Sequence, residues 1–279
     1  MTQPLFSILI PTWNNLAYLK LCIESIMKNS HYTHQIIIHI NEGIDGTLEW
    51  AQNHAGIEYT WSNENIGICK ALNLASTKAT TEYICYFNDD MFALPNWDTA
   101  LYAEIKKLGH HRFFFSSTMI EPFTGKNSCA IAGIDFGNNP ENFNQAALLE
   151  DFDKPMKQDW NGASWPPNVV HRSLWNAVGG YSEEFSPGLY SDPDFSMKLW
   201  HKGVRNFRGI GNSRVYHFGS KSLKRIKMND GRKTFKKKWG ITPGYFDKYF
   251  LRKGTIWTGE LSSPGKDIKY WLNRIRALF

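Results

Sequence analysis

Short apolar runs alternate with segments of helical periodicity along the first ninety residues. The runs are rich in Ile and aromatic residues, which is typical of strands covered on both faces, whereas the segments between them repeat apolar residues every three or four positions. The pattern predicts strands at 6–10, 35–40, 57–61 and 83–87 and helices at 16–27, 47–53 and 68–75. We expect Pro11 to end the first strand. Such alternation implies an α/β fold with right-handed crossovers and a mainly parallel sheet covered by helices on both faces.

Polar loops follow the predicted strands, all at one edge of the sheet. They cover residues 11–15, 41–46, 63–67 and 88–90. In open α/β sheets ligands bind at the carboxyl ends of the strands, so these loops should converge on one pocket, which suits a nucleotide. Beyond a further helix predicted at 97–108 the pattern becomes irregular.

The triplet Asn88-Asp89-Asp90 ends the last of these apolar runs. Adjacent carboxylates at the end of a buried strand suit a hard divalent cation such as Mg²⁺ or Mn²⁺, which would relieve their mutual repulsion. A diphosphate bound to that metal is the substrate that this chemistry favours. The alternative is that Asn and Asp cap the next helix, which is a common role of these residues.

Length and composition indicate a folded protein. The chain has 279 residues, of which 42% are hydrophobic and 15% aromatic, enough for a substantial core. Its four cysteines are scattered and show no paired metal-ligand spacing, which favours a reducing cytoplasm. No basic leader precedes the first apolar stretch, and no apolar run approaches the roughly 20 residues that cross a bilayer. We therefore expect neither secretion nor membrane spanning.

The net charge of +6 is unevenly distributed along the chain. Residues 220–279 hold 16 Lys and Arg and 4 Asp and Glu, a local balance of +12, which leaves −6 for residues 1–219. Apolar residues such as Leu223, Ile226 and Phe235 are interleaved with these cations. The segment suits an anionic membrane surface, or it packs its apolar side on the body and leaves a solvated basic face. No nucleic-acid-binding motif accompanies the charge, so we do not expect nucleic acid as a partner.

An ordered series of motifs resembles family 2 glycosyltransferases. Its members are Ser7-Ile8-Leu9-Ile10-Pro11-Thr12-Trp13-Asn14, Asn41-Glu42-Gly43, Asp45-Gly46-Thr47, Asn63-Glu64-Asn65-Ile66-Gly67, Phe87-Asn88-Asp89-Asp90, Gly179-Gly180-Tyr181, Ser191-Asp192-Pro193-Asp194 and Val215-Tyr216-His217. The resemblance implies the Rossmann-like GT-A fold and an inverting, metal-dependent transfer from a nucleotide sugar. We expect a GT-A domain at 1–219, with a nucleotide-sugar-binding half at 1–110 and an acceptor-binding half at 111–219. A basic, mostly helical C-terminal extension follows at 220–279.

The resemblance also implies roles for four residues. Asp90 and His217 are the expected ligands of Mn²⁺ or Mg²⁺, which would stabilise the charge on the departing diphosphate. Asp192 is the expected general base, because an attacking hydroxyl must lose its proton, and Asp194 is the second candidate. The alternative for Asp192 is an N-cap of the following helix, with Pro193 at the first helical position.

Further residues are expected to bind substrates. The resemblance assigns Pro11, Thr12 and Asn14 to the base and ribose, and Asn41 or Glu42 to the base edge. From their positions we also expect Asn65, Asn88 and Asp89 to bind substrate, and Lys70, one helical turn after Ile66, either to face the diphosphate or to be solvated. Trp165 either stacks on a sugar of the acceptor or covers the core. Many family members carry Asp where this chain has Asn41. UDP, GDP and dTDP sugars therefore all remain open as donors.

The resulting hypothesis is a cytoplasmic glycosyltransferase of polysaccharide biosynthesis. It would add a sugar to a hydroxyl of a glycan or lipid-linked glycan, and its basic C-terminus would hold it at the inner face of a membrane. One alternative is a non-catalytic protein that binds carbohydrate or nucleotide on the same fold. Another is a nucleotidyltransferase, against which the lack of a Gly- and Arg/Lys-rich loop after the first strand argues.

Overall fold

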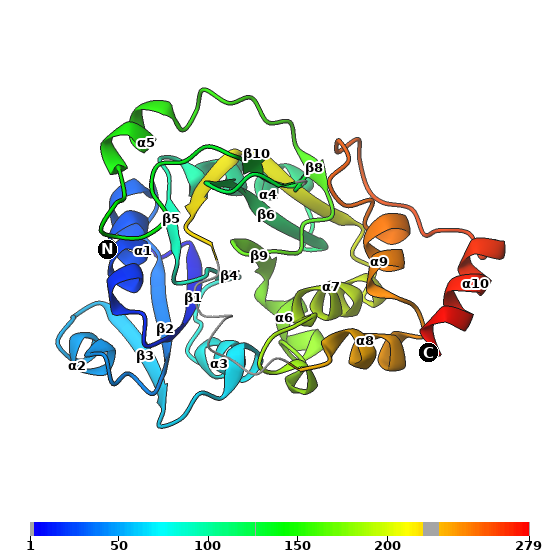
Figure 1. Ribbon diagram of the computed structural model, residues 1–279, viewed down its shortest axis with the longest axis horizontal. Coiled ribbons are helices and arrows are strands. Elements are labelled where there is room, and N and C mark those ends of the chain that lie inside the picture. The colour runs from blue at the N-terminus through cyan, green and yellow to red at the C-terminus, as the bar shows by residue number, and fades with distance from the viewer. Residues whose placement is uncertain (1–2, 126, 220–228, 279) are drawn as a thin grey trace.

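One sheet runs through the centre of the computed structural model, which describes residues 3–125, 127–219 and 229–278 (Figure 1). The strand order is β3-β2-β1-β4-β9-β6-β10-β5, with β7 beside β6 and β8 beside β10. The strands are β1 (Phe6–Trp13), β2 (Gln35–Asn41), β3 (Ile57–Ser62), β4 (Tyr83–Tyr86), β5 (Met91–Ala93), β6 (Phe113–Glu121), β7 (Ile131–Ala132), β8 (Trp160–Asn161), β9 (Asn168–His171) and β10 (Asn206–His217). The α-helices are α1 (Leu16–Asn29), α2 (Thr47–Gln52), α3 (Gly67–Ser76), α4 (Trp97–Leu108), α5 (Gln145–Asp151), α6 (Arg172–Val178), α7 (Ser191–His201), α8 (Gly231–Trp239), α9 (Pro243–Tyr245) and α10 (Ile268–Ala277). A 3₁₀ turn, η1 (Glu183–Phe185), and a π-helical turn, η3 (Phe246–Phe250), complete the set.

The first four predicted strands pair in parallel, as expected from their alternation with helices. β1 lies between β2 and β4, and β2 pairs with β3. β9 then runs antiparallel between β4 and β6, and β6 and β10 are again parallel. The polar loops after β1, β2, β3 and β4 therefore meet at one edge, which is where a ligand site was predicted.

The first strand continues past Pro11 to Trp13, so the prediction that Pro11 ends it is wrong. Pro11 stays in register with His39 of β2, whereas the pairing of β1 with β4 stops at Leu9. The carbonyl of Leu9 accepts a hydrogen bond from the amide of Phe87, so the N–H that Pro11 lacks would point to this same side. The pairing with β4 therefore stops where that donor would be needed next, whereas the pairing with β2, on the other side of the strand, does not use it and continues to Trp13.

Alternate residues of the strands enter two separate cores. In β2, Ile36, Ile38 and Ile40 face one core, and Ile37 faces the other. Residues of α1, α2 and α4 complete the first core, and residues of α3, α6 and α7 complete the second. All four cysteines are buried thiols. The sheet is thus covered by helices on both faces, as the sequence predicted.

The C-terminal helices gather at the end of the molecule opposite α1 and α2 (Figure 1). Phe235 of α8, Tyr245 of α9 and Phe246 of η3 are buried in the second core, which also contains Trp200 of α7. α8 therefore packs its apolar side on the body, the alternative predicted for the basic segment. The predicted cations and apolar residues at 220–228 lie outside the described residues. Within the described ranges, each helix is too short or too polar to cross a bilayer.

Candidate functional site

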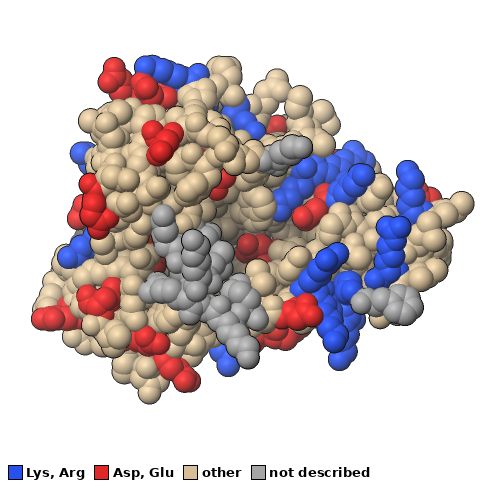
Figure 2. All heavy atoms as spheres, viewed as in Figure 1, with Lys and Arg blue, Asp and Glu red and all other residues tan. Residues whose placement is uncertain are grey.

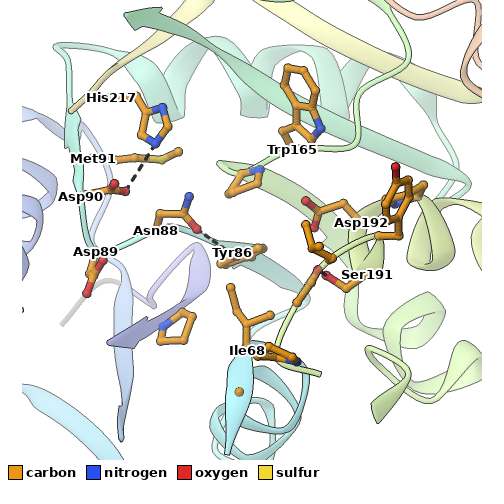
Figure 3. A pocket seen from close by; sticks show the side chains of 18 of the residues that line it. Ile68, Tyr86, Asn88, Asp89, Asp90, Met91, Trp165, Ser191, Asp192 and His217 are labelled. Atoms are coloured by element: carbon orange, nitrogen blue, oxygen red, sulfur yellow. Dashed lines mark hydrogen bonds and ion pairs between the residues drawn. The ribbon is translucent and has the colours of Figure 1, made fainter. Parts of the chain in front are cut away.

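A cavity of about 630 Å³ opens at the carboxyl ends of β1, β2 and β4. Figure 3 shows Asp90 and His217 on one side of it and Asp192 on the other, with Tyr86 between them. The predicted site residues that line this cavity are Pro11, Thr12, Asn41, Asn65, Asn88, Asp89, Asp90, Trp165, Asp192 and His217. Four other predicted residues are not part of the lining: Asn14, Glu42, Lys70 and Asp194.

The Asn88-Asp89-Asp90 turn lies between two strands. β4 ends just before it and β5 begins just after it, so the alternative that these residues cap a helix is wrong. The Thr12 hydroxyl donates a hydrogen bond to Asp89 Oδ2 at 2.7 Å, and the Tyr86 hydroxyl donates to Asn88 Oδ1 at 2.7 Å. Both bonds orient the side chains of the turn at the cavity wall.

Strand pairing brings Asp90 and His217 together although they are far apart in sequence. β5 pairs antiparallel with β10, with Met91 opposite His217, and the amide of Phe218 donates to the carbonyl of Asp90 at 3.1 Å. His217 Nε2 lies 3.5 Å from Asp90 Oδ1, which is an ion-pair contact longer than a normal hydrogen bond. His217 Nδ1 lies 3.0 Å from Glu121 Oε1.

The charges around His217 favour its protonated form. Burial alone lowers the pKa of His217, but Asp90 and then Glu121 outweigh it and raise the pKa to about 10. Burial also tends to raise the pKa of Glu121, whereas its contact with His217 lowers it overall. Without a metal, this side of the cavity is therefore an imidazolium between two carboxylates.

The residues around His217 suit a divalent cation. His217 Nε2 is buried and has no hydrogen-bond partner within the part of the chain that the structure describes, and it faces the Asp90 carboxylate. Glu121 holds Nδ1 and so fixes the ring, as carboxylates commonly do behind a histidine ligand. The described residues contain no group of three or more His, Cys, Asp and Glu arranged to hold a metal. Two protein ligands agree with the way Mg²⁺ is commonly bound, through few carboxylates together with substrate phosphates and water.

Asp192 lies in the first turn of α7 and faces the cavity. The helix begins at Ser191 after Tyr190, without a side-chain cap, so the predicted alternative of an Asp192 N-cap is wrong. The Tyr181 hydroxyl donates to Asp192 Oδ1 at 3.2 Å. Burial raises the pKa of Asp192 from 3.8 to about 6, against the opposing effects of Lys253 and the Tyr181 bond. A carboxylate with such a pKa is suited to accept a proton near neutral pH.

Asp194 points away from the cavity, so it is not positioned to act as the base. Its carboxylate is fully buried and accepts hydrogen bonds from Ser182 Oγ at 2.6 Å and Trp239 Nε1 at 2.8 Å. It also pairs with Lys238 Nζ at 3.0 Å. Asp192 and Asp194 are two positions apart on a helix and cannot share a face, so only one of them can reach the cavity. Asp194 instead ties α8 to α7.

Asn14 and Glu42 join the loops after β1 and β2 and are not part of the cavity lining. Asn14 Nδ2 donates to Glu42 Oε2 at 2.8 Å, and its Oδ1 accepts from the amides of Gly43 and Ile44 at 3.0 Å. Lys70 is exposed on α3, 4.0 Å from a carboxylate oxygen of Glu183. The structure therefore gives no support to direct substrate contacts by these three predicted residues.

Asn41 and Asn65 line the cavity and also shape the start of α3. Asn41 Oδ1 accepts from the amide of Ile66 at 2.9 Å, and Asn65 Oδ1 accepts from that of Gly67 at 2.9 Å. Gly67 has a φ of +76°, and a Cβ there would lie 2.9 Å from Pro187 Cα. Only glycine allows this close approach between α3 and the loop before α7.

The C-terminal segment contributes to the same cavity. Pro243, Asp247 and Lys253 are among its lining residues. Lys253 Nζ lies 3.8 Å from the centre of the Trp165 ring and 3.7 Å from Asp247 Oδ2. The cavity is therefore built from both sides of the predicted boundary at 219/220, and an ammonium group covers one face of Trp165.

Comparison with known proteins identifies the family. The sequence profile described as Glycosyl transferase family 2 matches residues 7–156, which is more than half of the chain. The chain belongs to glycosyl transferase family 2.

Two curated relatives support this family 2 assignment. The chain is 28% identical over 126 residues to a protein of Escherichia coli (strain K12) provisionally named colanic acid biosynthesis glycosyl transferase WcaA; the match covers 42% of this chain and 44% of that protein. It is 27% identical over 117 residues to an uncharacterized glycosyltransferase of Rickettsia bellii (strain RML369-C), over 40% of this chain and 16% of that protein. The matches thus span less than half the length of either relative.

Solved structures show that the family 2 chain has the GT-A fold. Staphylococcus aureus TarS 1–349 in complex with UDP-GlcNAc aligns with a TM-score of 0.59 at 15% identity, over 84% of this chain and 64% of that one. GalNAc-T7 with UDP, GalNAc and Mn²⁺ aligns with a TM-score of 0.56 at 16% identity, over 86% and 46%. At such low identity the likeness concerns the fold alone.

Sequence reasoning missed three residues of this family 2 site. Glu121 ends the apolar strand β6, the same signal that singled out Asn88-Asp89-Asp90, and it could have been found in that way. Tyr86 was read only as part of a buried strand, although its hydroxyl reaches the cavity wall. Lys253 comes from a segment with no periodic signal, and nothing local to it indicates its position.

Proposed function

We propose that this chain is an inverting glycosyltransferase that moves one sugar from a nucleotide sugar to a hydroxyl of a glycan or lipid-linked glycan. The observation that carries the proposal is the arrangement of Asp90 and His217 on one side of a cavity and Asp192 on the other (Figure 3). An inverting displacement needs these two sides, since the leaving group departs opposite the attacking hydroxyl. Membership of family 2 supports the reaction class.

The donor would be bound along β1, β2 and the Asn88-Asp89-Asp90 turn. TarS has been solved with UDP-GlcNAc and GalNAc-T7 with UDP and Mn²⁺, which supports a nucleotide sugar and a divalent metal here. Asp90 and His217 would hold Mn²⁺ or Mg²⁺, with Asp89 close by. When bound, the ion would neutralise charge on the departing diphosphate. Asn41, Pro11 and Thr12 would then lie near the nucleoside.

Asp192 would act as the general base. The acceptor oxygen attacks the anomeric carbon and forms the new glycosidic bond, while the bond between that carbon and the diphosphate oxygen breaks with its electrons. The hydroxyl proton passes to Asp192, whose pKa of about 6 leaves it ionised at neutral pH. The Tyr181 hydroxyl would orient this carboxylate.

The acceptor side would lie between Asp192, Trp165 and the C-terminal segment. We also propose that the predicted GT-A domain at 1–219 works together with residues 229–278, because Lys253 stands at the acceptor side. A lipid-linked acceptor would require the enzyme to work at the inner face of a membrane as a peripheral protein.

A screen of nucleotide sugars tests the proposal. Thermal shifts of the purified protein with UDP, GDP and dTDP sugars, each with Mn²⁺ or Mg²⁺, should show stabilisation by one nucleotide and only with metal. Release of that nucleoside diphosphate should follow, and Asp90→Asn should abolish it. The matched control is Asp153→Asn, which changes an exposed carboxylate outside the cavity.

Three results would contradict the proposed function. Stabilisation by no nucleotide at all would remove the donor site. Binding without turnover in the presence of candidate acceptors and of water would leave a non-catalytic binding protein. Pyrophosphate as the product would instead indicate a nucleotidyltransferase.

A further inference from the structure

Helix α10 carries an apolar stripe that the rest of the described chain does not cover. Its members are Ile268, Trp271, Leu272 and Ile275, followed by Leu278 just after the helix, with exposed fractions between 51% and 81%. The spacing of three and four residues places them on one side of the helix. Asn273 and Ala277 are buried on the opposite side, so the stripe points away from the body.

Cations flank this stripe on both sides. At about 100° per residue, Lys269 and Arg276 project from one flank of the helix and Arg274 from the other. The acidic residue next to the helix, Asp267, caps it by accepting from the amide of Tyr270 at 2.9 Å. Figure 2 shows Lys and Arg gathered at the end of the molecule formed by α8 and α10.

A basic groove lies between α10 and α7. It has a volume of about 410 Å³ and is lined by His201, Arg205, Lys266 and Arg274 together with aromatic residues, and its lining contains neither Asp nor Glu. The Arg205 guanidinium lies 4.0 Å from the Trp200 ring centre, and the His201 ring stacks on Trp239 at 5.2 Å. These contacts hold the side chains of Arg205 and His201 in place, so the groove suits a phosphate group.

We propose that α10 is a docking surface for a membrane that contains anionic phospholipid. The apolar stripe would enter the boundary between headgroups and acyl chains, the flanking cations would meet the surface charge, and the groove would receive a lipid phosphate. The cations around the stripe favour an anionic membrane over a second copy of the chain. Two copies joined through the stripe would bring Lys269, Arg274 and Arg276 of each against those of the other, and the cations would outnumber the one acidic residue beside the helix, Asp267.

The docking surface is rigidly linked to the wall of the cavity. Asn273 Oδ1 accepts from the amide of Thr242 at 2.9 Å, and Asn273 Nδ2 donates to Thr242 Oγ1 at 2.9 Å. The next residue, Pro243, lines the cavity. A membrane bound by α10 would thus lie at a fixed position relative to the acceptor side. The docking itself does not depend on the proposed sugar transfer.

Sedimentation with vesicles tests the docking surface. The full chain should bind vesicles of phosphatidylcholine with phosphatidylglycerol and bind pure phosphatidylcholine weakly. Trp271→Ser with Leu272→Ser should lower the partition coefficient at least tenfold, because two apolar side chains no longer insert. Lys266→Gln with Arg274→Gln should lower it about 25-fold, as each cation near an anionic surface contributes about fivefold.

Matched controls keep the interpretation specific. Ile44→Ser with Met156→Ser removes two exposed apolar side chains elsewhere, and Lys28→Gln with Lys78→Gln removes two exposed cations elsewhere; both pairs should bind vesicles like the parent protein. Circular dichroism and nucleotide-dependent thermal shifts check that each variant is folded.

Several outcomes would overturn the docking proposal. Equal binding to neutral and anionic vesicles, or equal losses in the control pairs, would contradict it. A dimer in analytical ultracentrifugation without lipid that Trp271→Ser with Leu272→Ser abolishes would make a second copy the occupant. Saturation of the groove by glycerol phosphate, seen by calorimetry without any vesicle binding, would make it a site for a soluble phosphate. By contrast, if Trp271→Ser with Leu272→Ser loses vesicle binding and keeps nucleotide binding, the result supports the docking surface independently of the proposed function.

Discussion

Replacing Asp192 by Asn should test the proposed base more sharply than any other single change. The amide of the Asp192→Asn variant keeps the size of the side chain and can still bond the Tyr181 hydroxyl, but it cannot accept a proton at neutral pH. General-base catalysis contributes on the order of 10²–10⁴-fold, so kcat should fall by that amount. Donor binding should stay unchanged, because Asp192 lies across the cavity from Asp90 and His217 (Figure 3).

The pH dependence gives a second measure of the same residue. With the pKa of Asp192 raised to about 6, its ionised fraction is about 9% at pH 5 and about 91% at pH 7, so kcat/KM should rise roughly tenfold between them. The hydrogen bond from Tyr181 lowers the pKa of Asp192. The variant Tyr181→Phe, which lacks this bond, should therefore show the rise in kcat/KM at higher pH. The assay is release of nucleoside diphosphate at saturating metal, with Asp153→Asn as control.

As the pH rises, the stability of the fold should decrease while the activity increases. The pKa of Asp192 in the folded protein is raised from its ordinary 3.8 to about 6, so the folded state binds the proton more tightly than the unfolded state does. This contribution to the free energy of unfolding is fully present below pH 3.8 and is lost as the pH rises through about 6. That loss is at most about 3 kcal/mol, and smaller because the carboxylate faces the open cavity. Asp192→Asn should thus raise the melting temperature at pH 8 and not at pH 3.5. A flat kcat/KM between pH 5 and 7, or an active Asp192→Asn enzyme, would refute the assignment.

Three further predictions concern the metal side and the C-terminal helices. Nearby carboxylates raise the pKa of His217 to about 10, so Mn²⁺ binding near pH 7.5 should release about one proton. Calorimetry in buffers of different ionisation enthalpy measures this proton, and release of none would exclude His217 as a ligand. Glu121→Gln should weaken Mn²⁺ binding by about 10- to 100-fold, since Glu121 orients the imidazole, and an unchanged Kd would contradict that role. Phe235→Ala should lower the free energy of unfolding by about 3–5 kcal/mol in denaturant titrations, whereas Trp271→Ala should change it little; equal effects would mean that α8 is not part of the core.

The sequence predicted the first ninety residues well because each strand and helix there is marked by its own local pattern. The effect of Pro11 was misjudged because it depends on which neighbouring strand the missing N–H would face, which is a tertiary property. The alternative roles of Asp192 and Asp194 could not be separated from sequence. Their difference depends on Lys238 and Trp239, which lie more than forty positions away and bind Asp194 but not Asp192.

The same reasoning explains which site residues remained hidden. Glu121 ends a buried strand and Asp90 follows one, so the two residues share the same local signal. Lys253 has no such signal. It reaches Trp165 because the chain beyond α8 folds back over the second core, and packing of that kind leaves no periodic trace in the sequence.

On one side of the cavity, Asp90 and Glu121 place two carboxylates around the imidazole of His217. Asp90 is buried and Glu121 is largely so, and two carboxylates near each other in the interior are costly unless a cation accompanies them. Without metal, the proton on His217 supplies that cation, which is why the carboxylates hold its pKa so high. A bound divalent ion would take over this role and displace the Nε2 proton. The imidazolium offsets one of the two negative charges and a bound divalent ion would offset both, so losing the metal should remove activity without unfolding the sheet edge that carries these residues.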